Sequence, residues 1–279
     1  MTRALVLGGG GVAGIAWETG VLFGLSEHRI DVHGADLVVG TSAGSTMGAQ
    51  LLSGATLAGL YDRHVFPPET STEIAAELDP DRTAREWGAL LANHDPGADL
   101  RAAIGRFALT APTPPERARR AVIEARLPSH QWPDQPLLVV TVDATTGAER
   151  VFSRDDGVSI VDAVAASCAV PGIWPPVTIE GRRYVDGGVR SSTNVDLALG
   201  HDVVLVLAPV PDFLALEPAI DKRVKKLHKK AKVVTIEPDD ASRQAIGPNP
   251  LDPSVAKAAA QAGRAQAAQV VAEVAEVWT

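Results

Sequence analysis

Two glycine-rich turns near the start of the chain contain the groups best suited to acyl chemistry. The second turn reads Gly-Thr-Ser-Ala-Gly over residues 40–44 and has the spacing GxSxG. Between a strand and a helix, such a turn forces a tight bend at which the serine hydroxyl projects outward, because the flanking glycines relieve steric clashes. Ser42 is therefore the candidate nucleophile, with Gly40 and Gly44 shaping its turn.

The first turn offers backbone amides in place of a reactive side chain. Residues 8–14 read Gly-Gly-Gly-Gly-Val-Ala-Gly. A glycine run that leads into a helix leaves N–H groups unpaired at the positive end of the helix dipole, where an oxyanion or a phosphate is stabilised. The candidate residues of this oxyanion loop are Gly9, Gly10, Gly11 and Gly14. A nucleophile beside an oxyanion site indicates acyl transfer.

A serine nucleophile also needs a proton acceptor, and Asp186 is the best candidate. Residues 177–185 are typical of a β-hairpin, so Asp186 falls at a strand end. Gly187 and Gly188 follow it and let the backbone bend close to another loop. An isolated Asp-Gly-Gly is usually only a turn, and the two upstream loops are what favour a catalytic reading.

A dinucleotide-binding fold is the first competing interpretation, because residues 9–14 also fit GxGxxG. That fingerprint requires an acidic residue at the end of the second strand to hold a ribose. Here the second expected strand ends in the serine turn, and Asp36 lies at its opposite end. The sequence therefore lacks the acidic residue that the dinucleotide interpretation requires.

An α/β-hydrolase triad is the second competitor, because the chain order Ser42, Asp186, His201 allows it. That fold reaches its nucleophile only after several strands, whereas Ser42 follows the second. His201 precedes an expected strand, which in a parallel sheet places it at the edge opposite the serine. A histidine base is therefore not expected.

The expected elements place these turns at strand ends. Residues 3–7, 12–28, 36–39 and 45–52 follow the order strand, helix, strand, helix, as in a parallel α/β layer. Residues from about 61 to 130 are polar, helix-prone and punctuated by proline, which predicts a helical insertion after the nucleophile helix. The sequence leaves open whether this insertion covers the serine. Further strands are expected at 137–142, 150–153, 203–207 and 233–236, and further helices at 160–167, 221–231 and 254–278.

Composition narrows the class of protein. The 279 residues are 46% hydrophobic, enough for one large globular α/β domain. A single cysteine excludes an internal disulfide framework. The first residues pass directly into a strand without the pattern of a signal peptide, and no apolar run approaches a membrane span, so a cytoplasmic location is expected.

One segment departs from the net charge of −8, which itself argues against nucleic-acid binding. Lys222–Lys232 holds seven of the 26 lysines and arginines and no acidic residue. At helical spacing these bases would point outward from a narrow apolar stripe. A solvated surface helix is the simpler interpretation, and peripheral contact with an anionic membrane surface is the functional hypothesis.

Taken together, the four motifs resemble the patatin-like phospholipases. The glycine loop, the GxSxG turn, the segment Ala-Ser-Cys-Ala-Val-Pro at 166–171 and the Asp-Gly-Gly turn occur in that family's order, between Leu5 and about Val195. One departure is Ala13, where many members have arginine or lysine before the last glycine of the first loop. The departure casts doubt on phosphate-headgroup recognition at that position and leaves the backbone donors in place.

The resemblance implies a single domain over 1–279, built as a three-layer α/β sandwich with a mainly parallel central sheet. It also implies a Ser–Asp dyad of Ser42 and Asp186 that cleaves lipid esters with no metal or organic cofactor. Trp17, Ile173 and Trp174 lie beside the proposed loops and are candidates for an acyl pocket, although core packing explains them equally well. A non-catalytic lipid- or acyl-binding module is the alternative function, and a protease or thioesterase is a lesser enzymatic one.

Overall fold

A single mixed sheet forms the centre of the molecule. The computed structural model describes residues 1–67, 73, 74, 76, 80–212, 214 and 216–278. The sheet order is β5-β6-β3-β2-β1-β7-β8, with β4 also pairing with β3. The parallel strands are β1 (Arg3–Leu7), β2 (Leu37–Thr41), β3 (Leu137–Asp143), β7 (Val203–Leu207) and β8 (Lys232–Ile236). The antiparallel strands are β4 (Glu149–Phe152), β5 (Val177–Ile179) and β6 (Arg182–Asp186).

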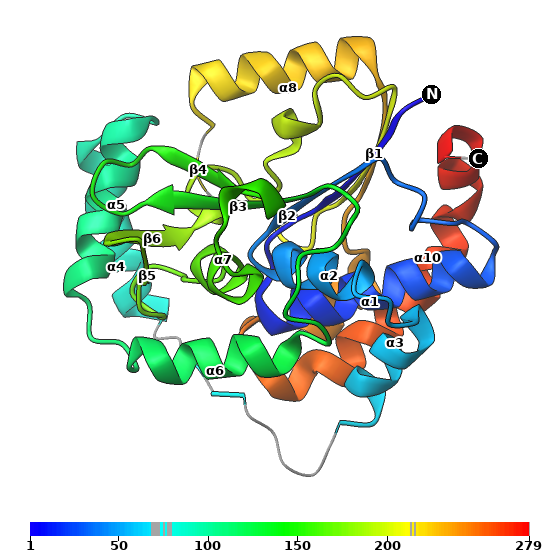
Figure 1. Ribbon diagram of the computed structural model, residues 1–279, viewed down its shortest axis with the longest axis horizontal. Coiled ribbons are helices and arrows are strands. Elements are labelled where there is room, and N and C mark those ends of the chain that lie inside the picture. Colours follow the sequence, from blue (N-terminus) through cyan, green and yellow to red (C-terminus); the bar gives the residue numbers. More distant parts are fainter. Residues whose placement is uncertain (68–72, 75, 77–79, 213, 215, 279) are drawn as a thin grey trace.

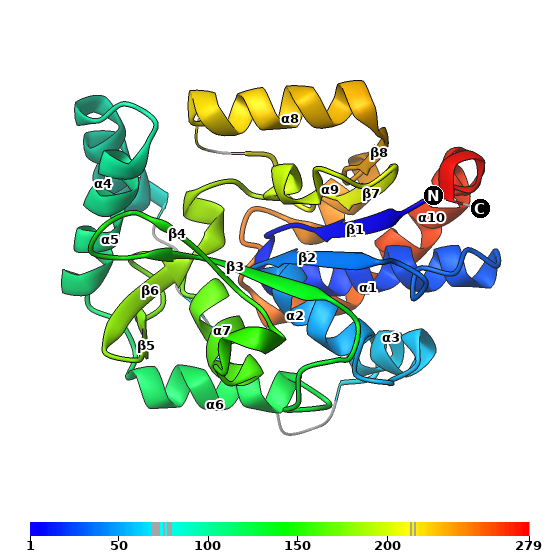
Figure 2. The ribbon, with the colours of Figure 1, turned by 45° about the horizontal axis from the view of Figure 1, so that its top comes forward.

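Helices cover both faces of this sheet, as Figures 1 and 2 show. Helices α1, α2, α3, α7, α9 and α10 lie on one side and α8 on the other, while α4 and α5 stand beyond the end that carries β4 to β6. The helix bounds are α1 (Gly11–Glu27), α2 (Ala43–Leu51), α3 (Leu57–Val65), α4 (Pro80–Asn93), α5 (Ala98–Thr110), α6 (Glu116–Arg126), α7 (Ile160–Ser167), α8 (Pro218–Lys230), α9 (Asp240–Ile246) and α10 (Ala256–Trp278). The expectation of an α/β fold with a mainly parallel sheet is confirmed.

The central strands are apolar on both sides because each side is covered. Successive strand residues point to opposite faces. Leu5 and Leu7 of β1 join the core cluster that contains Trp17 of α1, whereas Ala4 and Val6 join a second cluster that contains Leu227 of α8. The two clusters are the two interfaces of a three-layer sandwich.

Helices α1 and α10 pack at unusually close range. A Cβ added at Gly20 would lie 2.1 Å from the carbonyl oxygen of Ala260, and one at Gly263 would lie 2.4 Å from that of Trp17. Trp17 donates a hydrogen bond from Nε1 to Gln266 at 3.1 Å. The long C-terminal helix therefore holds α1, and with it the loop that precedes α1.

Several boundaries differ from the sequence expectations. Strand β2 continues to Thr41, so it delivers the chain directly to Ser42. Helix α8 ends at Lys230, and Lys232 begins β8, so the basic segment is not wholly helical. The helical insertion expected from about 61 falls on α4 to α6, but α3 already begins at Leu57, and part of the segment between α3 and α4 lies outside the described residues.

Candidate active site

Ser42 lies at the carboxyl end of β2 in a conformation that side chains seldom adopt. Its φ is 52° and its ψ is −113°, between the end of the strand and the start of α2. Neighbouring groups fix this backbone: the Ser42 N–H donates to Ser167 Oγ at 2.9 Å, and the Gly44 N–H donates to the Gly8 carbonyl at 2.8 Å. Such a strained turn persists only where its surroundings determine it, and it projects the hydroxyl outward as the GxSxG spacing predicts.

Close contact with β1 explains why residue 44 is glycine. A Cβ at this position would lie 2.0 Å from the carbonyl oxygen of Leu7. The absence of a side chain therefore lets α2 begin directly against the neighbouring strand, and it brings the serine turn beside the glycine loop that follows Leu7.

The glycine loop uses part of its own hydrogen-bonding capacity to hold its shape. The Gly8 N–H donates to the Leu207 carbonyl at 2.9 Å, and the Gly9 N–H donates to the Ser192 carbonyl at 2.8 Å. Gly10 precedes the first residue of α1, and Gly11 has a φ of 63°. The N–H groups of Gly10 and Gly11 stand at the start of the helix, so these two, and not Gly9, are the candidate oxyanion donors.

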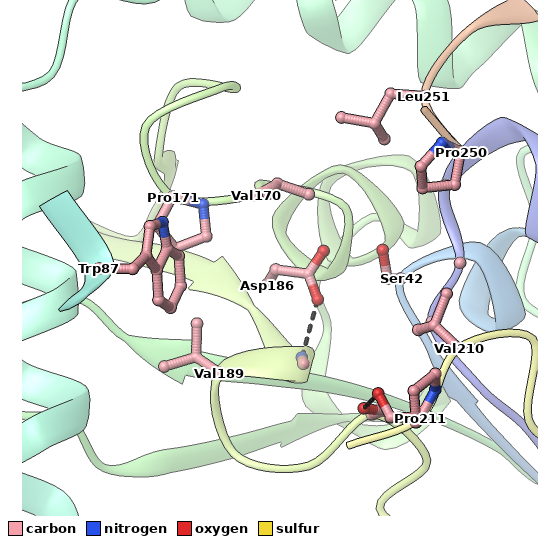
Figure 3. A pocket seen from close by; sticks show the side chains of 15 residues that line it. Ser42, Trp87, Val170, Pro171, Asp186, Val189, Val210, Pro211, Pro250 and Leu251 are labelled. Carbon is pink, nitrogen blue, oxygen red and sulfur yellow. Dashed lines mark hydrogen bonds between the residues drawn. The ribbon is translucent and has the colours of Figure 1, made fainter. Parts of the chain in front are cut away.

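Asp186 reaches the same edge of the sheet from the antiparallel side. It ends β6, is paired in register with Thr141 of β3, and accepts a hydrogen bond through Oδ1 from the Gly188 N–H at 2.7 Å. Figure 3 shows its carboxylate and the Ser42 hydroxyl pointing toward each other. Its Oδ2 is buried and accepts no hydrogen bond of normal geometry from the described residues. Hydrogen bonds between catalytic groups are in general often long in apo structures and tighten when substrate binds.

Burial makes Asp186 a stronger base than an ordinary aspartate. The side chain is 5% exposed, and this desolvation raises the pKa of Asp186 to about 7. The Ser42 hydroxyl, the Gly188 amide and the charge of Arg119 oppose the shift by stabilising the carboxylate. A base with a pKa near neutrality is well matched to proton transfer at physiological pH.

A buried asparagine connects the serine turn to the aspartate turn. Asn194 Nδ2 donates to Thr41 Oγ1 at 3.0 Å and approaches the Gly187 carbonyl at 3.3 Å. Its Oδ1 accepts a hydrogen bond from Arg190 at 2.6 Å, and Arg190 forms a bidentate pair with the buried Asp196. Asn194 is 0% exposed and has a φ of 51°. It thereby ties the residue before Ser42 to the residue after Asp186.

Ser42, Asp186 and the loop Gly9–Gly11 open into one cavity of about 340 Å³. That volume is at the lower end of the roughly 300–1,000 Å³ typical of small-molecule sites. Apolar side chains form two walls (Figure 3). The wall beside Asp186 consists of Trp87, Val170, Pro171 and Val189, and the wall beside the glycine loop consists of Val210, Pro211, Pro250 and Leu251.

Comparison with known proteins assigns the chain to a family. Residues 5–199 match the family model described as patatin-like phospholipase. The chain belongs to the patatin-like phospholipase family. An NTE family protein of Mycobacterium tuberculosis, described as uncharacterised, is 31% identical over 207 residues, which cover 74% of this chain and 48% of that protein. A protein of the same description from Mycobacterium bovis matches equally well. The chain thus spans about half the length of the curated relatives it matches.

Two solved structures resemble the whole chain more distantly. VipD from Legionella pneumophila is 14% identical with a TM-score of 0.46, over 98% of this chain and 67% of that one. The type III effector protein ExoU is 19% identical with a TM-score of 0.40, over 97% of this chain and 53% of that one.

The patatin-like motifs named from the sequence converge at one edge of the sheet, but not every predicted residue reaches the cavity. Ser42, Asp186, Gly188 and the loop Gly9–Gly11 line it. Gly14, Gly40, Gly44 and Gly187 shape the surrounding backbone and are not among the lining residues. His201 precedes β7, whose amino end lies at the opposite edge from Ser42, as expected.

The proposal that Trp17, Ile173 and Trp174 line the acyl pocket is wrong. Trp17 is buried between α1 and α10, and Trp174 is buried against Arg119, whose guanidinium carbon lies 3.9 Å from its ring centre. Neither these two nor Ile173 lines the cavity. Trp87 of α4 takes that place instead, and no local signal distinguished it from other apolar residues of the insertion.

The Ala13 departure has a structural explanation. Its side chain is fully buried in the main core cluster, and its N–H donates to the Pro250 carbonyl at 3.0 Å. The position therefore faces the protein interior and presents no charge to the cavity. Sequence reasoning also missed Pro250, which helps to hold the start of α1 while lining the pocket.

Proposed function

We propose that this chain is a serine acyl hydrolase that cleaves carboxylic esters of lipids. Membership of the patatin-like phospholipase family supports lipid hydrolysis in general. The observation that carries the finer proposal is the meeting of Ser42 and Asp186 in one apolar cavity beside the start of α1. Apolar walls suit an acyl chain, and the facing hydroxyl and carboxylate suit proton transfer.

In the proposed mechanism, Asp186 takes the hydroxyl proton through Oδ2 as Ser42 Oγ forms a bond to the ester carbonyl carbon. The N–H groups of Gly10 and Gly11 stabilise the resulting oxyanion. The bond from carbon to the alcohol oxygen then breaks, and Asp186 returns the proton to the leaving alcohol. Water attacks the acyl-serine, with Asp186 again accepting and returning the proton, which releases the acid and restores Ser42.

Hydrolysis of a p-nitrophenyl ester series and labelling by a fluorophosphonate test the dyad. We expect Ser42→Ala to abolish labelling and to lower turnover by at least about a thousandfold, and Asp186→Asn to lower turnover comparably. Ser254→Ala and Asp240→Asn make the same chemical changes at exposed positions outside the cavity and serve as controls. A folded wild type that neither labels nor turns over, even with lipid micelles present, would favour the alternative of a non-catalytic acyl-binding module.

We also propose that the basic segment contacts an anionic membrane surface. All seven of its lysines and arginines are exposed. Arg223 pairs with Asp196 and Lys225 pairs with Asp221, so part of the charge is already neutralised within the protein. Helix α8 turns Leu227 toward the sheet, which leaves its basic side toward solvent (Figure 2). No helix in the described part of the chain has the length and apolar character needed to cross a bilayer.

Vesicle sedimentation tests this surface proposal. Replacing Lys222, Lys226 and Lys229 by glutamine should weaken binding to phosphatidylserine vesicles by about a hundredfold, at roughly 1 kcal/mol per lost lysine. Turnover of a water-soluble ester should be unchanged, because these residues do not line the cavity. Binding that is indifferent to the three substitutions would contradict the proposal and leave α8 as a solvated helix.

A further inference from the structure

During the proposed reaction, the two walls of the cavity face different parts of the ester. The leaving alcohol receives its proton from Asp186, so its oxygen must lie beside Oδ2 when the ester bond breaks. Figure 3 places Asp186 between Ser42 and two residues of the wall beside it, Trp87 and Val189, while Val170 and Pro171 of the same wall lie above Asp186 in that view. That wall therefore faces the alcohol part of the ester, while the wall beside Gly10 and Gly11 faces the acyl part.

Asp186 gives the alcohol side of the cavity a negative charge, and none of the described residues that line the cavity is a cation. Asp186 is the one charged side chain among the described residues that line the cavity. A second carboxylate lies beside the other wall: the exposed Asp212, which follows Pro211, accepts hydrogen bonds from the Ser192 N–H at 2.5 Å and from the Ser191 hydroxyl at 3.3 Å. Both Ser192 and the preceding Pro211 line the cavity.

The cation that influences Asp186 is not placed to bind a substrate. Arg119 lowers the pKa of Asp186 through its charge. Its guanidinium is buried against Trp174, and neither residue lines the cavity. The buried Ala13 offers no charge either. An anionic group attached to the alcohol would therefore lose its hydration beside a carboxylate and gain no ion pair.

We infer that the site takes carboxylic esters whose alcohol part carries no negative charge, such as acylglycerols, in preference to esters of phosphorylated glycerol. This inference rests on the proposed function and specifies its substrate class. An uncharged alcohol places only carbon and hydroxyl groups against Val170 and Trp87, which is the chemistry that these side chains accommodate.

A matched pair of lipids tests the inference. Dioctanoylglycerol and dioctanoyl phosphatidic acid differ only by the phosphate, and both can be presented at equal mole fraction in micelles of an uncharged detergent. We expect kcat/KM for octanoate release to be at least about tenfold higher with dioctanoylglycerol. Anionic micelles attract the basic segment, so any surface effect would favour phosphatidic acid and work against the expected result.

A lysine introduced on one wall or the other tests which side of the cavity sets the lipid preference. Val170 and Leu251 are both partly exposed and line opposite walls. Val170→Lys supplies a cation on the alcohol side and should lower the preference for dioctanoylglycerol several-fold. Leu251→Lys adds the same charge on the acyl side and should keep the wild-type ratio, whatever its effect on absolute rates.

The outcomes separate this inference from the proposed function. A wild type that cleaves phosphatidic acid as fast as dioctanoylglycerol, or that cleaves p-nitrophenyl esters but neither lipid, would overturn the inference and leave the hydrolase assignment intact. A wild type that turns over no ester and is not labelled by fluorophosphonate would overturn both. An equal response of the lipid ratio to the two lysine variants would also contradict the assignment of the walls.

Discussion

At the scale of single residues, the proposed mechanism makes the burial of Asp186 the factor that sets the pH range of the reaction. Desolvation raises the pKa of Asp186 to about 7, and the base must be ionised to accept the serine proton. We therefore expect kcat/KM for a neutral ester to fall below pH 7 with a midpoint near 7. A midpoint close to 4, the ordinary aspartate value, would contradict this account.

Arg119 should tune that midpoint. Its positive charge stabilises the Asp186 carboxylate, so Arg119→Met should move the midpoint of the pH profile to higher pH. Arg106→Met removes a charge from an exposed position of α5 and should leave the midpoint in place. Denaturation at each pH shows whether either variant remains folded over the range used.

The same shift has a consequence for stability. Burial makes the folded state bind the Asp186 proton more tightly than the unfolded chain does. The contribution of this proton to the free energy of unfolding is therefore complete below the ordinary aspartate pKa and is lost as the pH rises to about 7. The free energy of unfolding of Asp186→Asn, measured relative to wild type, should therefore increase from about pH 4 to pH 7 and stay constant above that. A difference independent of pH would mean that Asp186 titrates normally.

Residues in glycine-rich turns could be predicted from the sequence, whereas residues that act through distant contacts could not. Ser42 and Asp186 carry local signals, since each stands at an expected strand end: Ser42 lies between Gly40 and Gly44, and Asp186 is followed by Gly187 and Gly188. By contrast, the Gly9 N–H donates to the carbonyl of Ser192, and the sequence could not predict this hydrogen bond because the two residues are far apart in the chain. The burial of Glu18 could not be predicted either, because the residue falls in an ordinary helical pattern. Glu18 is fully buried in α1, and this burial raises its pKa well above the ordinary value.

At the scale of elements, the site depends on two turns from different strands keeping a fixed separation. Strand β2 presents Ser42, and the antiparallel β6 presents Asp186. Neither strand pairs with the other, because β3 lies between them. Asn194 spans this gap through its bonds to Thr41 and Gly187, so we assign it the role of a positioning residue.

Removing the Asn194 side chain should therefore impair chemistry more than binding. We expect Asn194→Ala to lower kcat by about tenfold to a hundredfold with little change in KM, because small displacements of reacting groups are costly while the cavity walls remain. Asn93→Ala removes an exposed side chain whose hydrogen bond stays within α4 and serves as the control. A raised KM with unchanged kcat would show that Asn194 shapes the pocket and not the dyad.

The order of strands and helices was largely predictable because periodicity is local. Residues 3–7 were expected to be a strand, and β1 spans Arg3–Leu7. What periodicity could not reveal is how α4 packs. Trp87 reaches the cavity because α4 lies near α5, whose Leu100 and Ile104 share a cluster with Val185 and Val189. Such contacts between distant segments leave no pattern within either one.

At the scale of the whole molecule, the region matched by the family model leaves out part of the sheet and helix α10. The match ends at residue 199. Strand β7 begins at Val203 and pairs with all five residues of β1, and α10 packs against α1 beyond it. A fragment of residues 1–199 would expose an unpaired edge of β1 and the apolar side of α1.

We therefore expect the fragment 1–199 to lack a cooperative thermal transition, measured by circular dichroism, and to be inactive toward p-nitrophenyl esters. The full chain, expressed and purified in the same way, is the reference. A soluble fragment with a sharp transition would show that β7, β8 and α10 are dispensable for the core.

The late position of the acyl-side wall in the chain has one more consequence. Val210, Pro211, Pro250 and Leu251 all follow residue 199, whereas the dyad, the glycine loop and the alcohol-side wall precede it. In the proposed function, the catalytic groups and the acyl-side wall thus come from separate, consecutive stretches of the chain. Exchanging the stretch after residue 199 would replace the acyl-side wall, but it would also replace β7 and α10, which contact β1 and α1 beside the glycine loop.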